Sequence, residues 1–282
     1  MKAVREISAE AVTAAVRDLC IEANCAVGKD IKSSLARACD AETEELPRSV
    51  LRDLCENARL AEANSEPICQ DTGMTVVFVE TGQDAHVTGS LQDAINEGVR
   101  RGYEDGYLRK SVVRDPIRRE NTLDNTPAII HCDIVPGGLL KITVVPKGFG
   151  SENMSRLAML TPSRGLEGVK EFVVETVRVA GPNPCPPVVV GVGAGGTMEK
   201  ACLMAKHALL RRVGTKNSDP FWNKIEEELL TEINELGIGP AGFGGVTTAL
   251  AVFIETFATH IAGLPVAVNI SCHATRHATV IL

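Results

Sequence analysis

The first part of the chain carries apolar residues at helical spacing. The residues at three- and four-residue steps are Val12, Val16, Leu19, Ala23 and Val27, and Ser8 stands where the N-cap of such a helix would lie. A second series follows Pro47, at Leu51, Leu54, Ala58 and Ala61. The first 65 residues are therefore predicted to be helical.

From residue 66 onward the pattern alternates between short β-branched runs and longer amphipathic stretches. Strands are predicted at Met74–Glu80, Ala128–Val135, Leu139–Val145, Pro187–Val192 and Pro265–Ser271, with a short one near the C-terminus. Helices are predicted at Leu91–Tyr103, Gly165–Val179, Met198–Arg212, Phe221–Leu236 and Val246–His260. The two strands on either side of Pro136-Gly137-Gly138 are expected to form a hairpin. This order predicts an α+β fold, with an N-terminal helical layer (1–65) followed by a mixed sheet with packed helices (66–282) in one continuous domain.

Composition and charge narrow the function classes. Apolar residues make up 44% and charged residues 23% of the chain, which is typical of a globular protein. The formal net charge of −7 argues against nucleic acid or an anionic membrane as a general partner. The first 20 residues contain no apolar core of a signal peptide. The uncharged stretch 236–254 is rich in glycine, so we expect a buried loop and helix there rather than a membrane span.

Nine cysteines, widely spaced and odd in number, indicate a reducing, cytoplasmic location rather than a disulfide framework. Cys69, Cys185 and Cys272 each lie in a turn motif next to a predicted strand. Rigid turns suit thiolate ligands of a metal or an iron–sulfur cluster, whereas a single cysteine is more often a small buried apolar residue. Spacing alone leaves both interpretations open. The other six are expected in the core: Cys20, Cys25, Cys39, Cys55, Cys132 and Cys202.

Further polar residues also allow two interpretations each. Asp71 fits either a proton-transferring group or the first residue of an Asx-turn. Arg109 fits a carboxylate-binding fork or part of a solvated basic face. The segment Lys147–Asn153 fits a loop whose backbone N–H groups bind an anion, or an ordinary loop. The run Gly191–Gly196 matches the dinucleotide pattern G-x-G-x-x-G, or a tight strand-to-helix turn, and His260 fits a pocket or a surface position.

Three motifs together point to a family. Cys69-Gln-Asp-Thr-Gly73, Cys185-Pro-Pro187 with Gly191-Val-Gly193, and Cys272-His-Ala-Thr-Arg276 resemble the class I iron–sulfur hydro-lyases, which comprise fumarate hydratases and tartrate dehydratases. The resemblance runs from about Glu66 to Leu282. It implies a [4Fe–4S] cluster held by three thiolates, from Cys69, Cys185 and Cys272. The fourth iron then stays open as a Lewis acid for the substrate.

The resemblance also implies roles for other residues. Gln70 and Arg109 would contact substrate carboxylates, and Asp71 would be the acid/base group. Gly150, Ser151 and Asn153 would form an anion-binding loop, and His260 would line the substrate pocket. Single-chain members of the family continue into a second domain, whereas this sequence stops shortly after the third cysteine motif. We therefore expect an α subunit, completed by a separate β subunit in an α₂β₂ assembly.

The expected reaction is the reversible hydration of fumarate to (S)-malate. Thr126–His131 and Lys147–Asn153 look closer to the fumarate hydratase branch than to the tartrate branch. Three alternatives stay open: a tartrate dehydratase α subunit, a nucleotide-binding oxidoreductase that uses Gly191–Gly196, and an iron–sulfur electron carrier. In an electron carrier, Cys132 would be the candidate for a fourth cluster ligand.

Overall fold

The computed structural model describes residues 4–282, which form two compact units that interleave along the chain. The first unit comprises the described residues up to 27, residues 58–149 and residues 276–282. The second unit comprises residues 28–57 and 150–275. Both units combine helices with sheets, which confirms the α+β fold, while the division expected at residue 65 stays a prediction. No helix in the described part of the chain has the length and apolar character needed to cross a bilayer.

The first unit is built on a four-stranded sheet. Its strands are β2 (Met74–Gly82), β4 (Ile129–Val135), β5 (Leu140–Lys147) and β10 (Ala278–Ile281), in the order β10-β5-β2-β4. β2 pairs with β4 in parallel and with β5 in antiparallel orientation. A two-stranded parallel sheet joins β1 (Arg5–Ser8) to β3 (Ala85–Thr88). The turn after residue 135 thus reverses the chain, but β2 lies between the two strands that it connects.

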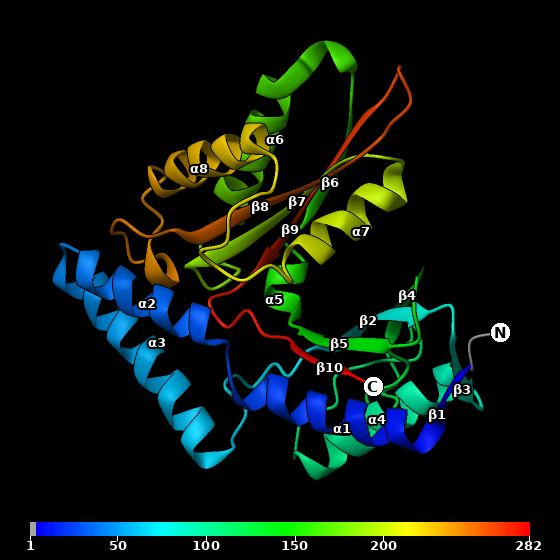
Figure 1. The fold of residues 1–282 in the computed structure, drawn as a ribbon. Coiled ribbons are helices and arrows are strands. Elements are labelled where there is room, and N and C mark those ends of the chain that lie inside the picture. Colours follow the sequence, from blue (N-terminus) through cyan, green and yellow to red (C-terminus); the bar gives the residue numbers. More distant parts are fainter. Residues whose placement is uncertain (1–3) are drawn as a thin grey trace. The chain divides into compact units, whose positions relative to one another are not determined.

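Two helices cover this sheet, α1 (Ala9–Cys25) and α4 (Leu91–Asp105), and Figure 1 shows them side by side. The close fit comes from glycines of α4, because a Cβ on Gly98 would lie 2.6 Å from the Cβ of Val16. Both helices begin at a serine N-cap: Ser8 accepts a bond from Ala11 N at 3.1 Å, and Ser90 accepts one from Asp93 N at 3.2 Å. Apolar residues of both helices and of the sheet form one buried core.

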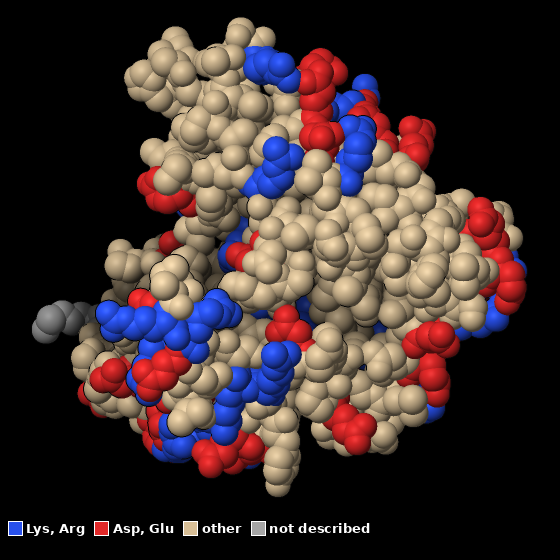
Figure 2. All heavy atoms as spheres, turned by 180° about the vertical axis from the view of Figure 1, so that it is seen from behind, with Lys and Arg blue, Asp and Glu red and all other residues tan. Residues whose placement is uncertain are grey.

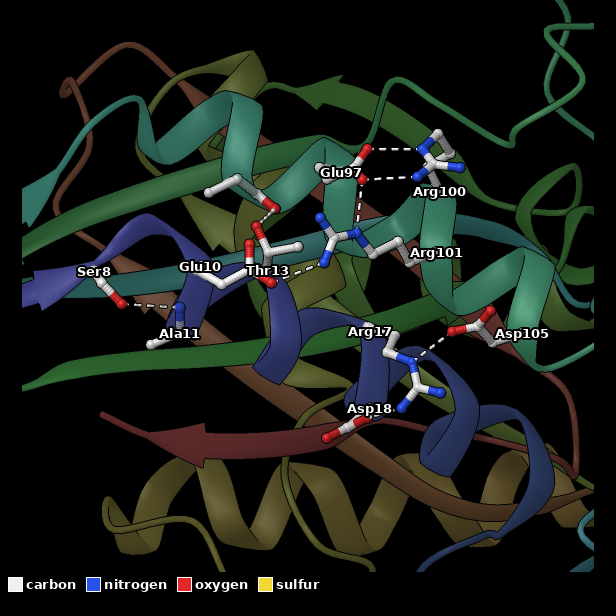
Figure 3. A network of polar contacts seen from close by, with 11 residues as sticks. Ser8, Glu10, Ala11, Thr13, Arg17, Asp18, Glu97, Arg100, Arg101 and Asp105 are labelled. Atoms are coloured by element: carbon white, nitrogen blue, oxygen red, sulfur yellow. Dashed lines mark hydrogen bonds and ion pairs between the residues drawn. The ribbon is translucent and has the colours of Figure 1, made fainter.

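Ion pairs line the outer side of the two helices (Figure 3). Arg17 Nε lies 2.7 Å from Asp105, and Arg101 joins Glu97 of its own helix to Glu10 of α1. These side chains are well exposed, so each pair contributes less than about 1 kcal/mol. The charged residues of the face drawn in Figure 2 are likewise interspersed, with acidic side chains close to basic ones.

The second unit contains its own four-stranded sheet, in the order β6-β9-β7-β8. The strands are β6 (Arg156–Leu160), β7 (Val188–Gly195), β8 (Ala249–Phe257) and β9 (Leu264–Ser271). β7 pairs with β8 in parallel and with β9 in antiparallel orientation. The remaining elements are α2 (Lys29–Ala41), α5 (Phe149–Glu152), α6 (Gly165–Ala180), α7 (Met198–Ala208), α8 (Pro220–Asn234) and short 3-10 turns at Pro162–Arg164 and Pro240–Gly242. α3 (Glu45–Asn64) continues from this unit into the first.

Helices cover both faces of the second sheet (Figure 1). Val188, Val190 and Val192 of β7 pack with apolar residues of α6 and α8 in one buried core. The alternate residues Gly191 and Gly193 point at α7, since a Cβ on either would lie 2.1 Å from a carbonyl oxygen of that helix. Strand geometry explains this division, because successive residues of a strand face opposite sides.

The structure corrects three sequence expectations. Residues 246–260 do not form a helix: β8 occupies most of this range, because an apolar run of this kind also suits a buried strand. The strands of the expected hairpin do not pair, since β2 separates them. The helix expected at 198–212 ends at Ala208. The short strands β1, β3 and β6 have no counterpart among the predicted elements.

Candidate functional site

The loop from Cys69 to Gly73 lies in the first unit, directly before β2. Cys69 is half-buried, and its Sγ accepts a hydrogen bond from Asp71 N at 3.4 Å. Gly73 has φ +75, and a Cβ there would lie 2.8 Å from backbone atoms of Lys147. Only glycine allows this approach to the end of β5. The loop is therefore held in one conformation, with its sulfur next to a backbone N–H donor.

Two backbone N–H groups hold the carboxylate of Asp71. Gly73 N donates to Oδ1 at 3.0 Å, which is an Asx-turn, and Phe149 N donates to Oδ2 at 2.8 Å. Gly148 lies close enough that a Cβ there would be 3.2 Å from the same Oδ2. The Asx-turn interpretation of the sequence is thus confirmed, and it is compatible with a chemical role because the carboxylate is fixed in place.

Gln70 belongs to this loop, and Arg109 is bonded to it. Gln70 is exposed, and its Oε1 is 3.3 Å from the Sγ of Cys69. The carbonyl oxygen of Arg109 accepts a bond from Thr72 Oγ1 at 2.7 Å, which joins the two segments. Arg109 is exposed and forms no ion pair with any residue that the structure describes. Its guanidinium is therefore available to an external carboxylate.

The sequence interpretation missed Arg276, which is only 5% exposed. Its Nη2 donates to the carbonyl oxygen of Asp71, and its Nε to that of Pro146 at 3.4 Å. Its Nη1 is buried without a hydrogen-bond partner. Arg276 belongs to the third cysteine motif, and that position was the only sequence signal pointing to it. It fixes the Asp71 loop from a segment about 200 residues further along the chain.

Cys185 and Cys272 lie together in the second unit. Cys185 is exposed in a turn with φ +55, and its N–H donates to Pro182 O at 3.0 Å. The main-chain N–H of His273 donates to Cys185 O at 3.3 Å, and its Nδ1 lies 3.0 Å from the same oxygen. The pairing of β7 with β9 brings these two cysteine turns to the same end of the sheet. Two of the three predicted ligands are thus neighbours.

The three residues expected to form the anion-binding loop, Gly150, Ser151 and Asn153, lie in the same unit. A Cβ on Gly150 would be 3.7 Å from Asn183 O, so this glycine lies close to the Cys185 turn. Ser151 is buried and Asn153 is exposed. The neighbouring Glu152 accepts a bond from Asn269 of β9 at 2.9 Å, which anchors the segment to the sheet.

His260 lies elsewhere in the second unit. It follows β8, which runs parallel to β7, so it lies at the end of the sheet opposite to Cys185 and Cys272. The length of β7 separates these two ends by roughly 25 Å. His260 lines a pocket of about 300 Å³ together with Lys200 and Thr197. Within one chain, the structure does not bring this histidine to the two cysteines.

The remaining cysteines divide into buried and exposed ones. Cys20 and Cys25 are buried, as expected, and burial raises the pKa of the Cys20 thiol to about 12. Cys39 and Cys55 are half-buried, whereas Cys132 and Cys202 are exposed, so the core expectation is wrong for these two. Cys132 lies opposite Val79, five residues into β2 from Met74, which places it roughly 17 Å along the strand from the start of β2. It therefore lies well away from the Cys69 loop.

The structure does not support the dinucleotide interpretation of Gly191–Gly196, because Gly191 and Gly193 do not lie in a turn between a strand and a helix. Residues 188–195 form a continuous strand, and Gly191 and Gly193 are explained by the close packing of α7. A phosphate-binding turn would instead leave these glycines between a strand and a helix.

The three cysteines are suitable ligands for the iron–sulfur cluster that the motifs imply. Cys69, Cys185 and Cys272 are free thiols on turns, none is fully buried, and Cys69 has an N–H donor at its sulfur. No group of three or more His, Cys, Asp or Glu side chains placed to hold a metal ion occurs among residues 4–282. The convergence of all three sulfurs stays a prediction.

Known proteins resemble this chain over most of its length. A family described as Fumarate hydratase (Fumerase) matches residues 13–281. The "Putative L(+)-tartrate dehydratase subunit alpha" of Methanocaldococcus jannaschii is 43% identical over 270 residues, which is 93% of this chain and 94% of the relative. The "L(+)-tartrate dehydratase subunit alpha" of Escherichia coli O157:H7 is 34% identical over 257 residues, 90% of this chain and 84% of the relative. These matches agree with the three cysteine motifs, and the chain therefore belongs to the class I fumarate hydratase family of hydro-lyases.

Proposed function

We propose that this chain is the α subunit of a [4Fe–4S]-dependent hydro-lyase that adds water to fumarate to give (S)-malate, and reverses the reaction. A separate β subunit would complete each site in an α₂β₂ assembly, as the subunit names of the relatives suggest. The observation that carries the proposal is the Cys69–Gly73 loop. It places a thiol, an amide and a fixed carboxylate in consecutive residues beside a segment with an unpaired guanidinium.

Cys69, Cys185 and Cys272 would hold the cluster. When bound, it supplies an iron with no thiolate ligand, which acts as a Lewis acid on the substrate hydroxyl. Three thiolates, rather than four, are what such an open iron requires. The N–H of Asp71 would then stabilise the charge on the sulfur of Cys69 through the bond that it already makes.

The chain's own residues would bind and protonate the substrate. Arg109 and Gln70 would hold one carboxylate, since a guanidinium offers two parallel N–H donors in the geometry of a carboxylate. Asp71, fixed by Gly73 N and Phe149 N, would accept or donate the proton. Gly150, Ser151 and Asn153 would offer N–H and side-chain donors to the second carboxylate. The other acid/base group would come from the β subunit.

L(+)-Tartrate is the second candidate substrate, because both relatives are named for it. It differs from malate by one additional hydroxyl group. A site that hydrogen-bonds such a hydroxyl discriminates against the molecule lacking it by about 10⁴-fold or more, whereas a site without that partner discriminates weakly. A side-by-side assay therefore separates the two candidates clearly.

The test is anaerobic co-purification of the chain with candidate β subunits, followed by iron and sulfide analysis and by assays with fumarate, (S)-malate and L(+)-tartrate. We expect an iron–sulfur cluster in the complex and turnover of the malate–fumarate pair. Turnover of tartrate alone would move the substrate assignment, and a complex without iron and sulfide would refute the proposal.

Asp71→Asn tests the role of the carboxylate. We expect the cluster content to stay the same and kcat to fall by about 10²–10⁴-fold, the usual contribution of a positioned acid/base group. Asp133→Asn is the matched control, because Asp133 is an exposed residue of β4. Near-normal turnover in Asp71→Asn would remove this residue from the mechanism.

A further inference from the structure

One buried side chain connects the loop of Asp71 with the segment of Arg109. Asn125 has no exposed surface, and its Nδ2 donates to Gly73 O at 3.1 Å. Its Oδ1 accepts bonds from Ser111 N at 2.7 Å and from Val112 N at 3.2 Å. The side-chain amide of Asn125 therefore bonds the Asp71 loop through its nitrogen and the Arg109 segment through its oxygen. Its left-handed backbone, with φ +62, is a conformation that asparagine tolerates better than most residues.

Gly73 is the shared point of this connection. Its N–H donates to Asp71 Oδ1 at 3.0 Å, and its carbonyl oxygen receives Asn125. Two residues before Ser111, Arg109 has its own carbonyl bonded to Thr72 Oγ1. A continuous series of bonds thus runs from the Asp71 carboxylate through Gly73 and Asn125 to the segment that carries Arg109.

Tyr103 supports the same loop but not the same connection. Its hydroxyl donates to Thr72 O at 2.6 Å and lies 3.1 Å from Gly73 O. Burial raises the pKa of this hydroxyl, so it remains a donor over the range in which enzymes work. Within residues 4–282, no hydrogen bond of the Tyr103 side chain reaches residues 109–112. Tyr103 and Asn125 therefore share Gly73 O as an acceptor, but only Asn125 also bonds Ser111 and Val112.

We propose that Asn125 is a positioning residue that sets the placement of Arg109 relative to Asp71, and so selects substrates whose carboxylate lies at a fixed distance from the carbon that exchanges the proton. This rests on the proposed function. Reacting groups must be held within about 0.5 Å of the productive geometry, which a clamp on a long exposed loop does not achieve alone. The buried amide adds a constraint to the bond between Thr72 and Arg109 O, because it holds the backbone at Ser111 and Val112, directly after the residue that carries the exposed guanidinium.

A double-mutant cycle in the αβ complex tests this role. Asn125→Asp keeps the two accepted bonds and replaces the N–H that donates to Gly73 O with a carboxylate oxygen that repels it, while Asn125→Gly keeps the left-handed backbone and removes all three bonds. We expect each Asn125 variant to lower kcat/KM for the diacid that the complex turns over by about 10-fold, mostly by raising KM. The iron and sulfide content should not change. In an Arg109→Gln background the same changes should lower kcat/KM less than about threefold, because Asn125 acts through Arg109.

Tyr103→Phe is the matched control. It removes a bond from the same loop, and its effect on kcat/KM should be the same in the wild-type and the Arg109→Gln backgrounds. Equal effects of Asn125→Asp in the two backgrounds would show a merely structural role and overturn the proposal.

Amide hydrogen exchange of the full chain supplies a readout that does not depend on turnover. Asn125→Gly should speed exchange at Ser111 and Val112, whereas Tyr103→Phe should not. If the wild-type complex proves inactive on both diacids, the proposed function fails, but this exchange experiment still decides whether Asn125 fixes the segment of Arg109. Unchanged exchange at both amides would refute the proposal.

Discussion

Gly193→Ala is the change whose effect the structure specifies most directly. A Cβ at this position would lie 2.1 Å from Ala201 O and 2.7 Å from Ala205 N, both backbone atoms of α7. Backbone atoms cannot rotate away, so α7 would have to move by about 1.4 Å to restore an ordinary contact of roughly 3.5 Å. That movement would open the buried contact around Ala201 and Ala205, which are 0% and 1% exposed.

The expected cost is about 3 kcal/mol, at the upper end of the usual range for a methyl group inserted into a packed interior. For a unit of this size it corresponds to a fall in the unfolding temperature of about 6–12 °C. Thermal and urea unfolding of the chain measure this cost. Gly263→Ala is the control in the same unit, because its nearest neighbour would be 3.7 Å away, and we expect a change within about 0.5 kcal/mol. If Gly193→Ala unfolds at the same temperature as the control, α7 does not pack as closely on β7 as described.

Two further predictions concern stability. Burial raises the pKa of Cys20 from 9.0 to about 12, so above pH 9 the unfolded chain binds fewer protons than the folded one, and the free energy of unfolding should fall as pH rises from 9 to 12, by of order 1 kcal/mol per pH unit. Urea titrations across this range should show a shallower fall in Cys20→Ala, and identical slopes would contradict the assignment. Arg276→Lys should lower the free energy of unfolding by about 1–3 kcal/mol, since one ammonium cannot reproduce both carbonyl bonds, and an unchanged urea midpoint would show that these bonds do not stabilise the loop.

The sequence predicted helices and strands well where the pattern of apolar residues was local and extended over many residues. The helices α4, α6 and α8 follow their apolar spacing closely, and so do the buried strands β2, β7 and β9. The helix expected at 246–260 was wrong because the apolar residues 249–254 have no period by which a helix differs from a buried strand. The predicted hairpin of β4 and β5 was wrong for another reason. β2 pairs with both strands, and the local sequence of a strand does not show which distant strand it pairs with.

The residues of the candidate site also differ in how far the sequence predicts them. Three of the cysteines, Asp71 and Arg109 were candidates from the sequence because each lies in a motif of a few residues, and their roles stay predictions. Asn125 and Tyr103 were not predicted, since their partners are backbone groups of Thr72, Gly73, Ser111 and Val112. Backbone donors and acceptors are nearly the same in every residue, so the sequence does not mark them. Arg276 bonds to Asp71 O and Pro146 O, and these contacts also span distant segments.

The pairing of β10 with β5 has a consequence for synthesis on the ribosome. Ala278 to Ile281 supply the outermost strand of a sheet whose other three strands end by Lys147. More than one hundred residues of the second unit are therefore translated while one edge of β5 is still unpaired. A nascent chain stalled anywhere in that interval would present an open strand edge, and chaperones that recognise extended segments would be its natural first contacts.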